Sequence, residues 1–265
     1  MPVSVRTQRR DDGVAILTLD DPERRNAMTE SMGDALRDAA AGLQDDPGLR
    51  AVVLTGTPPA FSAGGDLAML EDLARRTRDE GYDATDFMRE FYARFLSVRD
   101  LPVPVIAAIN GHAVGAGLCV ALACDLRIVA DEAKVGLNFA RLGLHPGMGG
   151  SWLLTRVLGP QRAAEWLYTG RLVSGREAAS AGMALESLPA DEVLPRAIAL
   201  AEEVAAASPL TVRQLKQTLT TTEGADLATA LQREAECQAV SYGSDDLLEG
   251  LAAGRERRPP DFTGR

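Results

Sequence analysis

Two stretches of small residues have the composition that reactive sites need, namely residues 62–67 and residues 115–117. Each follows an apolar run typical of a buried strand and precedes a predicted helix. A strand that leads through a glycine-rich turn into a helix directs unpaired backbone N–H groups at one point. Small side chains at the turn let a ligand approach the backbone closely. The sequence therefore predicts a site for an oxygen atom that is negative or becomes negative during a reaction.

The elements that must position these turns alternate between strands and helices. This alternation favours an α/β fold with a parallel sheet. A third glycine-rich loop covers residues 142–150, and a charged segment without apolar periodicity, residues 76–85, is predicted to be a mobile surface loop. Beyond about residues 190–205 the pattern predicts helices alone. The predicted strands are residues 14–19, 50–55, 103–109 and 126–130, and the predicted helices before that point include residues 29–43, 66–76 and 85–99.

Composition excludes several classes of protein. The chain has 265 residues, 46% of them hydrophobic, and a net charge of −10, which argues against a broad nucleic-acid surface. No apolar run is long enough to span a membrane, and the first twelve residues are polar, so we expect no signal peptide and a cytoplasmic location. Three cysteines at unrelated spacings indicate neither a disulfide framework nor a metal site.

Two chemical interpretations fit the glycine-rich turns. A dinucleotide site of the Rossmann type needs G-x-G-x-x-G directly after a strand, but Val120 stands at the third glycine position here, although Asp131 could act as the ribose-binding acid. The other interpretation is an oxyanion hole, in which one backbone N–H from each turn binds the same carbonyl oxygen. The second interpretation explains why the chain has two similar strand–turn–helix units.

The order of the motifs resembles the crotonase superfamily, the enoyl-CoA hydratases and isomerases. The resemblance rests on residues 62–67, on residues 110–117 with Cys124 and Asp125, and on the loop at 142–150 followed by Leu153. Residues 22–28 resemble the coenzyme A loop of the family, and residues 248–262 its usual C-terminus. The resemblance implies an α/β crotonase (ClpP-like) spiral of β-β-α repeats over residues 1–195. It also implies a helical trimerisation region over residues 196–265, in a homotrimer or a dimer of trimers.

The same resemblance assigns expected roles to individual residues. The oxyanion-hole amides would be those of Gly65 and Ala116, and Lys216 or Arg233 would reach the phosphates of coenzyme A. Coenzyme A would enter as part of an acyl-CoA substrate, with no permanently bound cofactor and no metal. Its other binding residues would be Arg24, Arg25, Ala27, Ala63, Gly64, Asp66 and Leu67.

This sequence departs from the pattern of the family at the acid/base positions. Cys119 and Phe139 stand where hydratases have two glutamates, and Gly147 stands where some relatives have an aspartate. A paired-carboxylate mechanism needs two acids. His145, in the third glycine-rich loop, is the best candidate for proton transfer because histidine titrates near neutrality.

Several other residues have a plain structural interpretation. His112 is expected to have no catalytic role. Asp66 is expected to cap a helix, and Cys119 is expected to pack as a small apolar side chain. Glu71, Asp72 and Tyr92 are further candidates to enter the acyl pocket. We expect an atypical enoyl-CoA hydratase/isomerase; the alternatives are a non-catalytic acyl-CoA-binding protein and a CoA thioester hydrolase or decarboxylase.

Overall fold

A computed structural model describes residues 3–222 and 224–265. Residues 1–2 of the predicted core and residue 223 of the predicted helical region lie outside the described residues. The predicted boundary at 195/196 falls inside one helix, α7 (Ala190–Ala205), which packs against strands of the main sheet. The division of the chain into two units stays a prediction.

Ten strands form two sheets within the described residues. The larger sheet has the order β1 (Ser4–Arg9), β2 (Val14–Asp20), β3 (Ala51–Gly56), β5 (Val105–Ile109), β7 (Leu126–Ala130) and β10 (Glu186–Leu188); only the β1–β2 pair is antiparallel. The smaller sheet has the order β4 (Ala60–Ser62), β6 (His112–Val114), β8 (Lys134–Gly136) and β9 (Val173–Ser174), with only β8–β9 antiparallel.

From β3 to β8, successive strands alternate between the two sheets. The pairs β3–β4, β5–β6 and β7–β8 each place the first strand in the larger sheet and the second in the smaller one. The first two pairs are followed by a helix, α2 (Leu67–Glu80) and α4 (Ala116–Ala123). Because β4 pairs in parallel with β6, the turns at which α2 and α4 begin follow neighbouring strands of one sheet. This register brings the two glycine-rich turns together.

Helices cover both sheets. α1 (Glu30–Gln44) is capped by Thr29, whose hydroxyl accepts a hydrogen bond from the backbone N–H of Met32, and its buried Leu36, Ala40 and Leu43 form one apolar face. α3 (Thr85–Leu96) continues into a 3₁₀ turn, η2 (Ser97–Asp100). The remaining elements are η1 (Pro22–Arg24), η3 (Asn138–Leu142), α5 (Gly150–Thr169), α6 (Gly175–Ser180), α8 (Pro209–Thr221), α9 (Leu227–Tyr242) and α10 (Asp245–Glu256).

The structure corrects one prediction about secondary structure and adds a strand that was not predicted. The segment predicted as a mobile loop, residues 76–85, is mostly helical, because α2 continues to Glu80 and ends at Gly81, which adopts a left-handed conformation. Arg75 pairs with Asp72 and Glu80 along this charged turn, so ion pairs take the place of an apolar face. The polar N-terminus forms β1 at the edge of the sheet. The span of α5 is interrupted at Gly159, whose φ and ψ angles are not helical, so two helical segments meet there at a kink before Pro160.

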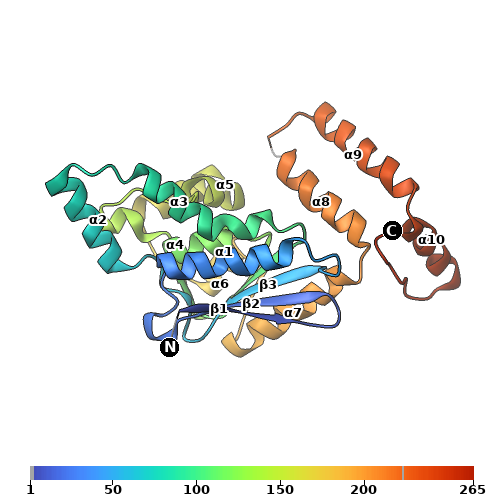
Figure 1. Cartoon of the computed structure of the whole chain (residues 1–265), viewed down its shortest axis with the longest axis horizontal. Coiled ribbons are helices and arrows are strands. Elements are labelled where there is room, and N and C mark those ends of the chain that lie inside the picture. The colour runs from blue at the N-terminus through green and yellow to red at the C-terminus, as the bar shows by residue number, and fades with distance from the viewer. Residues whose placement is uncertain (1–2, 223) are drawn as a thin grey trace.

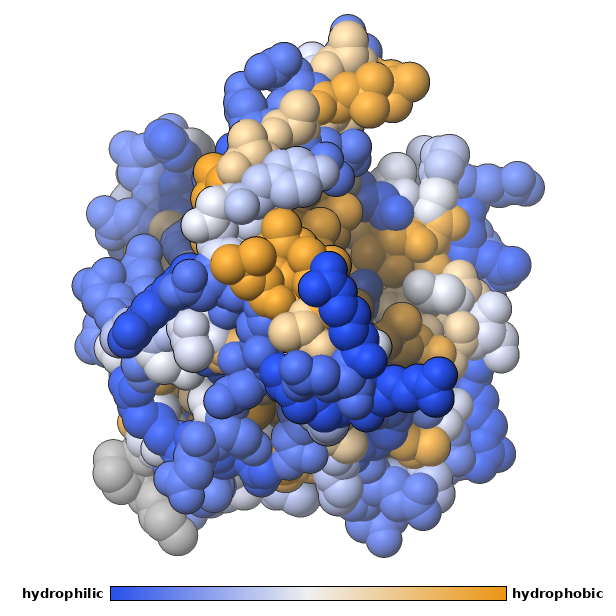
Figure 2. Space-filling view, turned by 90° about the vertical axis from the view of Figure 1, so that its right-hand side faces the viewer, coloured by the Kyte–Doolittle hydropathy of each residue, from blue (hydrophilic) through white to orange (hydrophobic). Residues whose placement is uncertain are grey.

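α2 and α3 lie at the opposite end of the molecule from α8, α9 and α10 (Figure 1). The three C-terminal helices carry exposed apolar side chains, which form a hydrophobic patch on the face that they present in Figure 2. The exposed members on these helices are Leu215, Leu219, Leu227, Leu231, Val240, Leu248 and Leu251. The α2–α3 end contains the cavity described next.

Candidate active site

The first glycine-rich turn is held by hydrogen bonds from a buried serine. The Ser62 hydroxyl donates to the carbonyl oxygen of Asn26 at 2.7 Å and accepts from the Gly64 N–H at 3.2 Å. The Met28 N–H donates to the Gly64 carbonyl oxygen at 2.8 Å. Gly64 has φ +96°, a conformation that favours glycine. These contacts fix the direction of the Gly65 backbone.

The second turn connects β6 to α4. Gly115 is the N-cap of α4, with φ +55°, and its N–H donates to the Gly136 carbonyl oxygen at 2.9 Å. Ala116 is the first residue of the helix, so its N–H has no acceptor within the helix. The first intrahelical bond runs from the Cys119 N–H to the Gly115 carbonyl oxygen.

The two turns are in direct contact. A Cβ atom added to Gly64 would lie 2.5 Å from the Val114 carbonyl oxygen and 3.7 Å from the Ala116 nitrogen, and a Cβ atom on Gly117 would lie 2.7 Å from the Ser62 hydroxyl. Among the backbone hydrogen bonds between described residues, none uses the N–H of Gly65 or of Ala116. Two donors without a backbone acceptor therefore stand on adjacent turns, and their role as an oxyanion hole stays a prediction.

Both turns open into one cavity of about 890 Å³. Its wall is mostly apolar, with contributions from α2, α3, η3 and the loop at 142–148. The predicted residues that line it are Ala63, Gly64, Gly65, Leu67, Ala116 and His145, together with the candidates Glu71 and Tyr92. An apolar wall lowers the local dielectric and strengthens hydrogen bonds to a developing charge.

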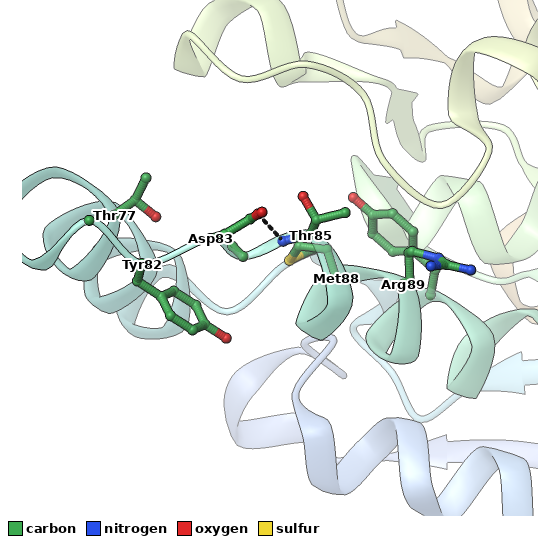
Figure 3. A pocket seen from close by; sticks show the side chains of 9 residues that line it. Thr77, Tyr82, Asp83, Thr85, Met88 and Arg89 are labelled. Carbon is green, nitrogen blue, oxygen red and sulfur yellow. Dashed lines mark hydrogen bonds between the residues drawn. The ribbon is translucent and has the colours of Figure 1, made fainter.

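A second, more open pocket of about 680 Å³ adjoins this cavity between the end of α2 and the start of α3. The two share Thr77, Ala84, Met88 and Tyr92. Figure 3 shows the outer pocket, where the Asp83 carboxylate accepts a hydrogen bond from the Thr85 N–H at 2.9 Å. The outer pocket is lined by several polar side chains, those of Thr77, Asp83, Thr85 and Arg89.

His145 lies at the exposed rim of the cavity. Its Nδ1 is 2.8 Å from the carbonyl oxygen of Pro146. A carbonyl oxygen can only accept a hydrogen bond, so the neutral ring carries its proton on Nδ1 and leaves the lone pair of Nε2 available. This tautomer can act as a base toward the cavity. The other histidine, His112, accepts a hydrogen bond from the Lys134 N–H at 3.0 Å and does not line the cavity.

Cys119 and Phe139, the positions at which the family resemblance implies glutamates in hydratases, carry no acidic group. Cys119 is fully buried, burial raises the pKa of its thiol to about 12, and the thiol donates to the Gly147 carbonyl oxygen at 3.5 Å. Phe139 is buried and lines the cavity. A thiol with this raised pKa and an aromatic hydrocarbon ring are not suited to proton transfer at neutral pH.

The predicted coenzyme A loop lies directly beside the first turn. The Arg25 carbonyl oxygen accepts a hydrogen bond from the Ala63 N–H at 2.9 Å, and the side chains of Arg24 and Arg25 are exposed. Ala27 is buried beneath them. None of these three residues lines the cavity itself.

Sequence reasoning missed the residue that anchors this loop, Asn26. Its side chain is fully buried; the amide donates to the Thr57 and Ala60 carbonyl oxygens, at 2.9 and 2.8 Å, and the side-chain oxygen accepts from the Asp21 N–H at 2.9 Å. Asn26 adopts a φ of +55°, which asparagine tolerates better than most residues. This tolerance was the one feature of the sequence that could have pointed to its role. The reasoning also did not assign a role to Asn138, whose Oδ1 would lie 3.1 Å from a Cβ atom on Gly115.

Three residues predicted or considered for binding have other partners. Lys216 forms an ion pair with Asp125 at 2.9 Å and donates to the Val103 carbonyl oxygen, and Arg233 donates to the Gln217 side chain. These contacts join α8 to the core and to α9, so neither cation is directed at the cavity. Asp66 caps α2 by accepting from the Met69 N–H at 2.9 Å and is not part of the cavity wall.

In the part of the chain that the structure describes, no group of three or more His, Cys, Asp or Glu side chains is arranged to hold a metal ion. Among the described helices, none is long and apolar enough to cross a membrane.

Comparison with known proteins identifies relatives of the whole chain. Residues 9–265 match the family model for enoyl-CoA hydratase/isomerase. A Thermus thermophilus protein provisionally named as an enoyl-CoA hydratase is 40% identical, with coverage of 94% of this chain and 97% of the relative. The enoyl-CoA isomerase/hydratase of Mycosarcoma maydis is 34% identical, covering 96% of this chain and 93% of the relative.

A solved structure shares the fold. The crystal structure of enoyl-CoA hydratase from Bacillus anthracis superposes with a TM-score of 0.89 and 32% identity, covering 99% of this chain and all of the other. The predicted fold class, an α/β crotonase spiral with a C-terminal helical region, is confirmed by this likeness and by the alternation of strands between two sheets.

Proposed function

This chain belongs to the enoyl-CoA hydratase/isomerase family, and from that premise we propose that it binds an acyl-CoA thioester and stabilises its enolate with the backbone amides of Gly65 and Ala116. The observation that carries the proposal is the contact between the two turns. Both amides lack a backbone acceptor, and both residues line the same apolar cavity.

The geometry supports a specific first step. When water adds to C3 of a trans-2-enoyl thioester, the electrons of the double bond move toward the carbonyl and the thioester oxygen becomes negative. Two preorganised N–H donors in a cavity with an apolar wall stabilise that oxygen more than they stabilise the neutral carbonyl. Removal of one donor from such a site lowers kcat about 100- to 1,000-fold.

His145 is the proposed base that removes a proton from the attacking water. It lines the cavity, and Nε2 carries the lone pair because Nδ1 contacts the Pro146 carbonyl oxygen. Cys119 and Phe139 cannot take this role. The coenzyme A moiety would lie along the turn at 63–67 and the loop at 22–28, with Arg24 and Arg25 exposed toward its phosphates.

The absence of both glutamates favours a second candidate, a protein that binds acyl-CoA without turnover. The oxyanion donors would then serve only to hold the thioester carbonyl. A CoA thioester hydrolase or decarboxylase would use the same donors and would release free CoA or carbon dioxide. The exposed leucines of α8 and α9 support a further proposal, that the chain assembles as a homotrimer or a dimer of trimers.

The test is the loss of the enoyl-thioester absorbance with short, medium and long trans-2-enoyl-CoAs, for the wild type and for His145→Ala. His112→Ala is the matched control, because His112 does not line the cavity. Hydration by the wild type and by His112→Ala, but not by His145→Ala, is the expected result. Tight binding without any loss of absorbance would refute hydration and favour the acyl-CoA-binding protein.

A further inference from the structure

One polar side chain inside the cavity has no role in the proposal above. Tyr92, on α3, lines both the inner cavity and the outer pocket. Its hydroxyl lies against the backbone of the third glycine-rich loop, because a Cβ atom added to Gly147 would be 2.5 Å from the Tyr92 oxygen. No hydrogen bond to another described side chain or backbone group is found for this hydroxyl. Its proton therefore remains available to a bound substrate.

The position of this hydroxyl relates it to the oxyanion donors. The Cys119 thiol donates to the carbonyl oxygen of Gly147, the same residue that Tyr92 contacts. Cys119 lies three residues after Ala116 on α4, so the two share a helix face and are offset by about 4.5 Å along the axis. Tyr92 thus approaches the loop that contacts α4, and it lines the same cavity as Gly65 and Ala116. A thioester whose carbonyl oxygen is bound by the Gly65 and Ala116 amides would therefore share this cavity with the Tyr92 hydroxyl.

We propose that Tyr92 is a catalytic residue, the proton donor to the α-carbon of the enolate that the Gly65 and Ala116 amides hold. This inference rests on the proposed function, because it needs an enolate in the cavity. It adds the group that completes the addition of water. Neither Cys119 nor Phe139 can supply that proton, and His145 lies at the exposed rim, where it meets the incoming water.

The step balances without another reactant. The water oxygen forms a bond to C3 and gives one proton to His145. The enolate then takes the Tyr92 proton, so that a C–H bond forms at the α-carbon as the phenol O–H bond breaks. Solvent carries the proton from His145 back to the phenolate. The net change is one water added across the double bond.

The surroundings keep the phenol in the donor form at neutral pH. Burial raises the pKa of Tyr92 above its usual range, and the nearby Cys119 raises it further. The other titratable or charged side chains that line its two pockets come from α2, the 81–84 segment, α3 and the 142–148 loop; they are Glu71, Arg78, Tyr82, Asp83, Arg89 and His145. A neutral phenol among them can donate a proton and cannot accept one.

The test compares Tyr92→Phe with the matched control Tyr82→Phe. Tyr82 lines only the outer pocket, where its ring lies 3.9 Å from the guanidinium carbon of Arg76. We measure kcat and KM for hydration of a trans-2-enoyl-CoA, thermal unfolding, and the Kd of the saturated acyl-CoA by calorimetry. The expected result for Tyr92→Phe is a fall in kcat of about 100- to 1,000-fold with KM and Kd within about two-fold of wild type. Tyr82→Phe should keep wild-type kcat.

A second measurement separates proton donation from packing. Incorporation of 3-fluorotyrosine at position 92 lowers the phenol pKa and should move the alkaline limb of the kcat profile to lower pH. Tyr92→Phe with kcat near that of the wild type, or an alkaline limb that 3-fluorotyrosine does not move, would overturn the inference and leave the proposed function intact. A wild-type enzyme that hydrates no enoyl-CoA would overturn both.

Discussion

Replacement of Ala116 by proline removes one oxyanion donor with little change to the fold. Ala116 is the first residue of α4, where proline is well tolerated because its N–H has no helical acceptor. Gly115 precedes it with φ 55° and ψ −123°, the mirror image of an extended conformation, which glycine adopts without steric cost. The variant should therefore keep every backbone bond of α4, including that from the Cys119 N–H to the Gly115 carbonyl oxygen.

The expected cost follows from the loss of one of two donors in an apolar cavity. One oxyanion donor contributes about 2.7–4 kcal/mol to the transition state, so kcat for hydration should fall about 100- to 1,000-fold. Binding of the ground-state thioester should change much less, because its carbonyl carries little charge. The assay is the rate of enoyl-thioester absorbance loss, with thermal unfolding measured on the same samples.

Two controls make the result interpretable. Ala116→Ser keeps the backbone N–H at the same site and should keep kcat within a few fold of wild type. Asp245→Pro places proline at the first position of α10, far from the cavity, and should leave kcat unchanged. A folded Ala116→Pro variant with wild-type kcat would refute the oxyanion role of this amide.

Two further predictions concern stability and assembly. Asp246 is 3% exposed, and this burial raises the pKa of its carboxyl. Hydrogen bonds from the Ser208 hydroxyl and from the N–H groups of Thr263 and Gly264 outweigh burial, so the pKa lies below the ordinary value of 3.8. Asp246→Asn should lower the free energy of unfolding by about 1–3 kcal/mol at pH 7, and this difference from the wild type should shrink as the pH falls below 3.8. Urea titrations of both proteins across pH would measure the difference. A constant difference down to pH 2 would contradict this assignment. The wild type should sediment as a trimer or hexamer and the variant Leu219→Asp as smaller species; a monomeric wild type would contradict the proposed assembly.

Some features could be predicted because their signal is local. The apolar strands of the larger sheet, the caps at Thr29 and Asp66, and the two glycine-rich turns each follow from residue types within a few positions. The prediction that the acid/base pair is missing also came from local signals, because Cys119 and Phe139 occupy positions counted from recognisable motifs. The fold class followed from the order of those motifs along the chain.

Other features depend on contacts between residues that are far apart in the sequence. Only the parallel pairing of β4 with β6 shows that the turns at Gly64 and Ala116 touch. The sequence did not predict β1, since an edge strand can be polar, and it did not predict that ion pairs extend α2. Lys216 was expected near a phosphate, but the tertiary structure pairs it with Asp125, 91 residues away.

The sequence by itself determined which chemistry the backbone can do, and the tertiary structure decided which side chain can assist it. Glycine and alanine at the turns limit the local backbone to conformations with free N–H groups, and this constraint acts within a few residues. The contact of Tyr92 with Gly147 joins α3 to a loop more than fifty residues later. Such a contact exists only after both elements have packed on α4, because burial, and not local spacing, brings them together.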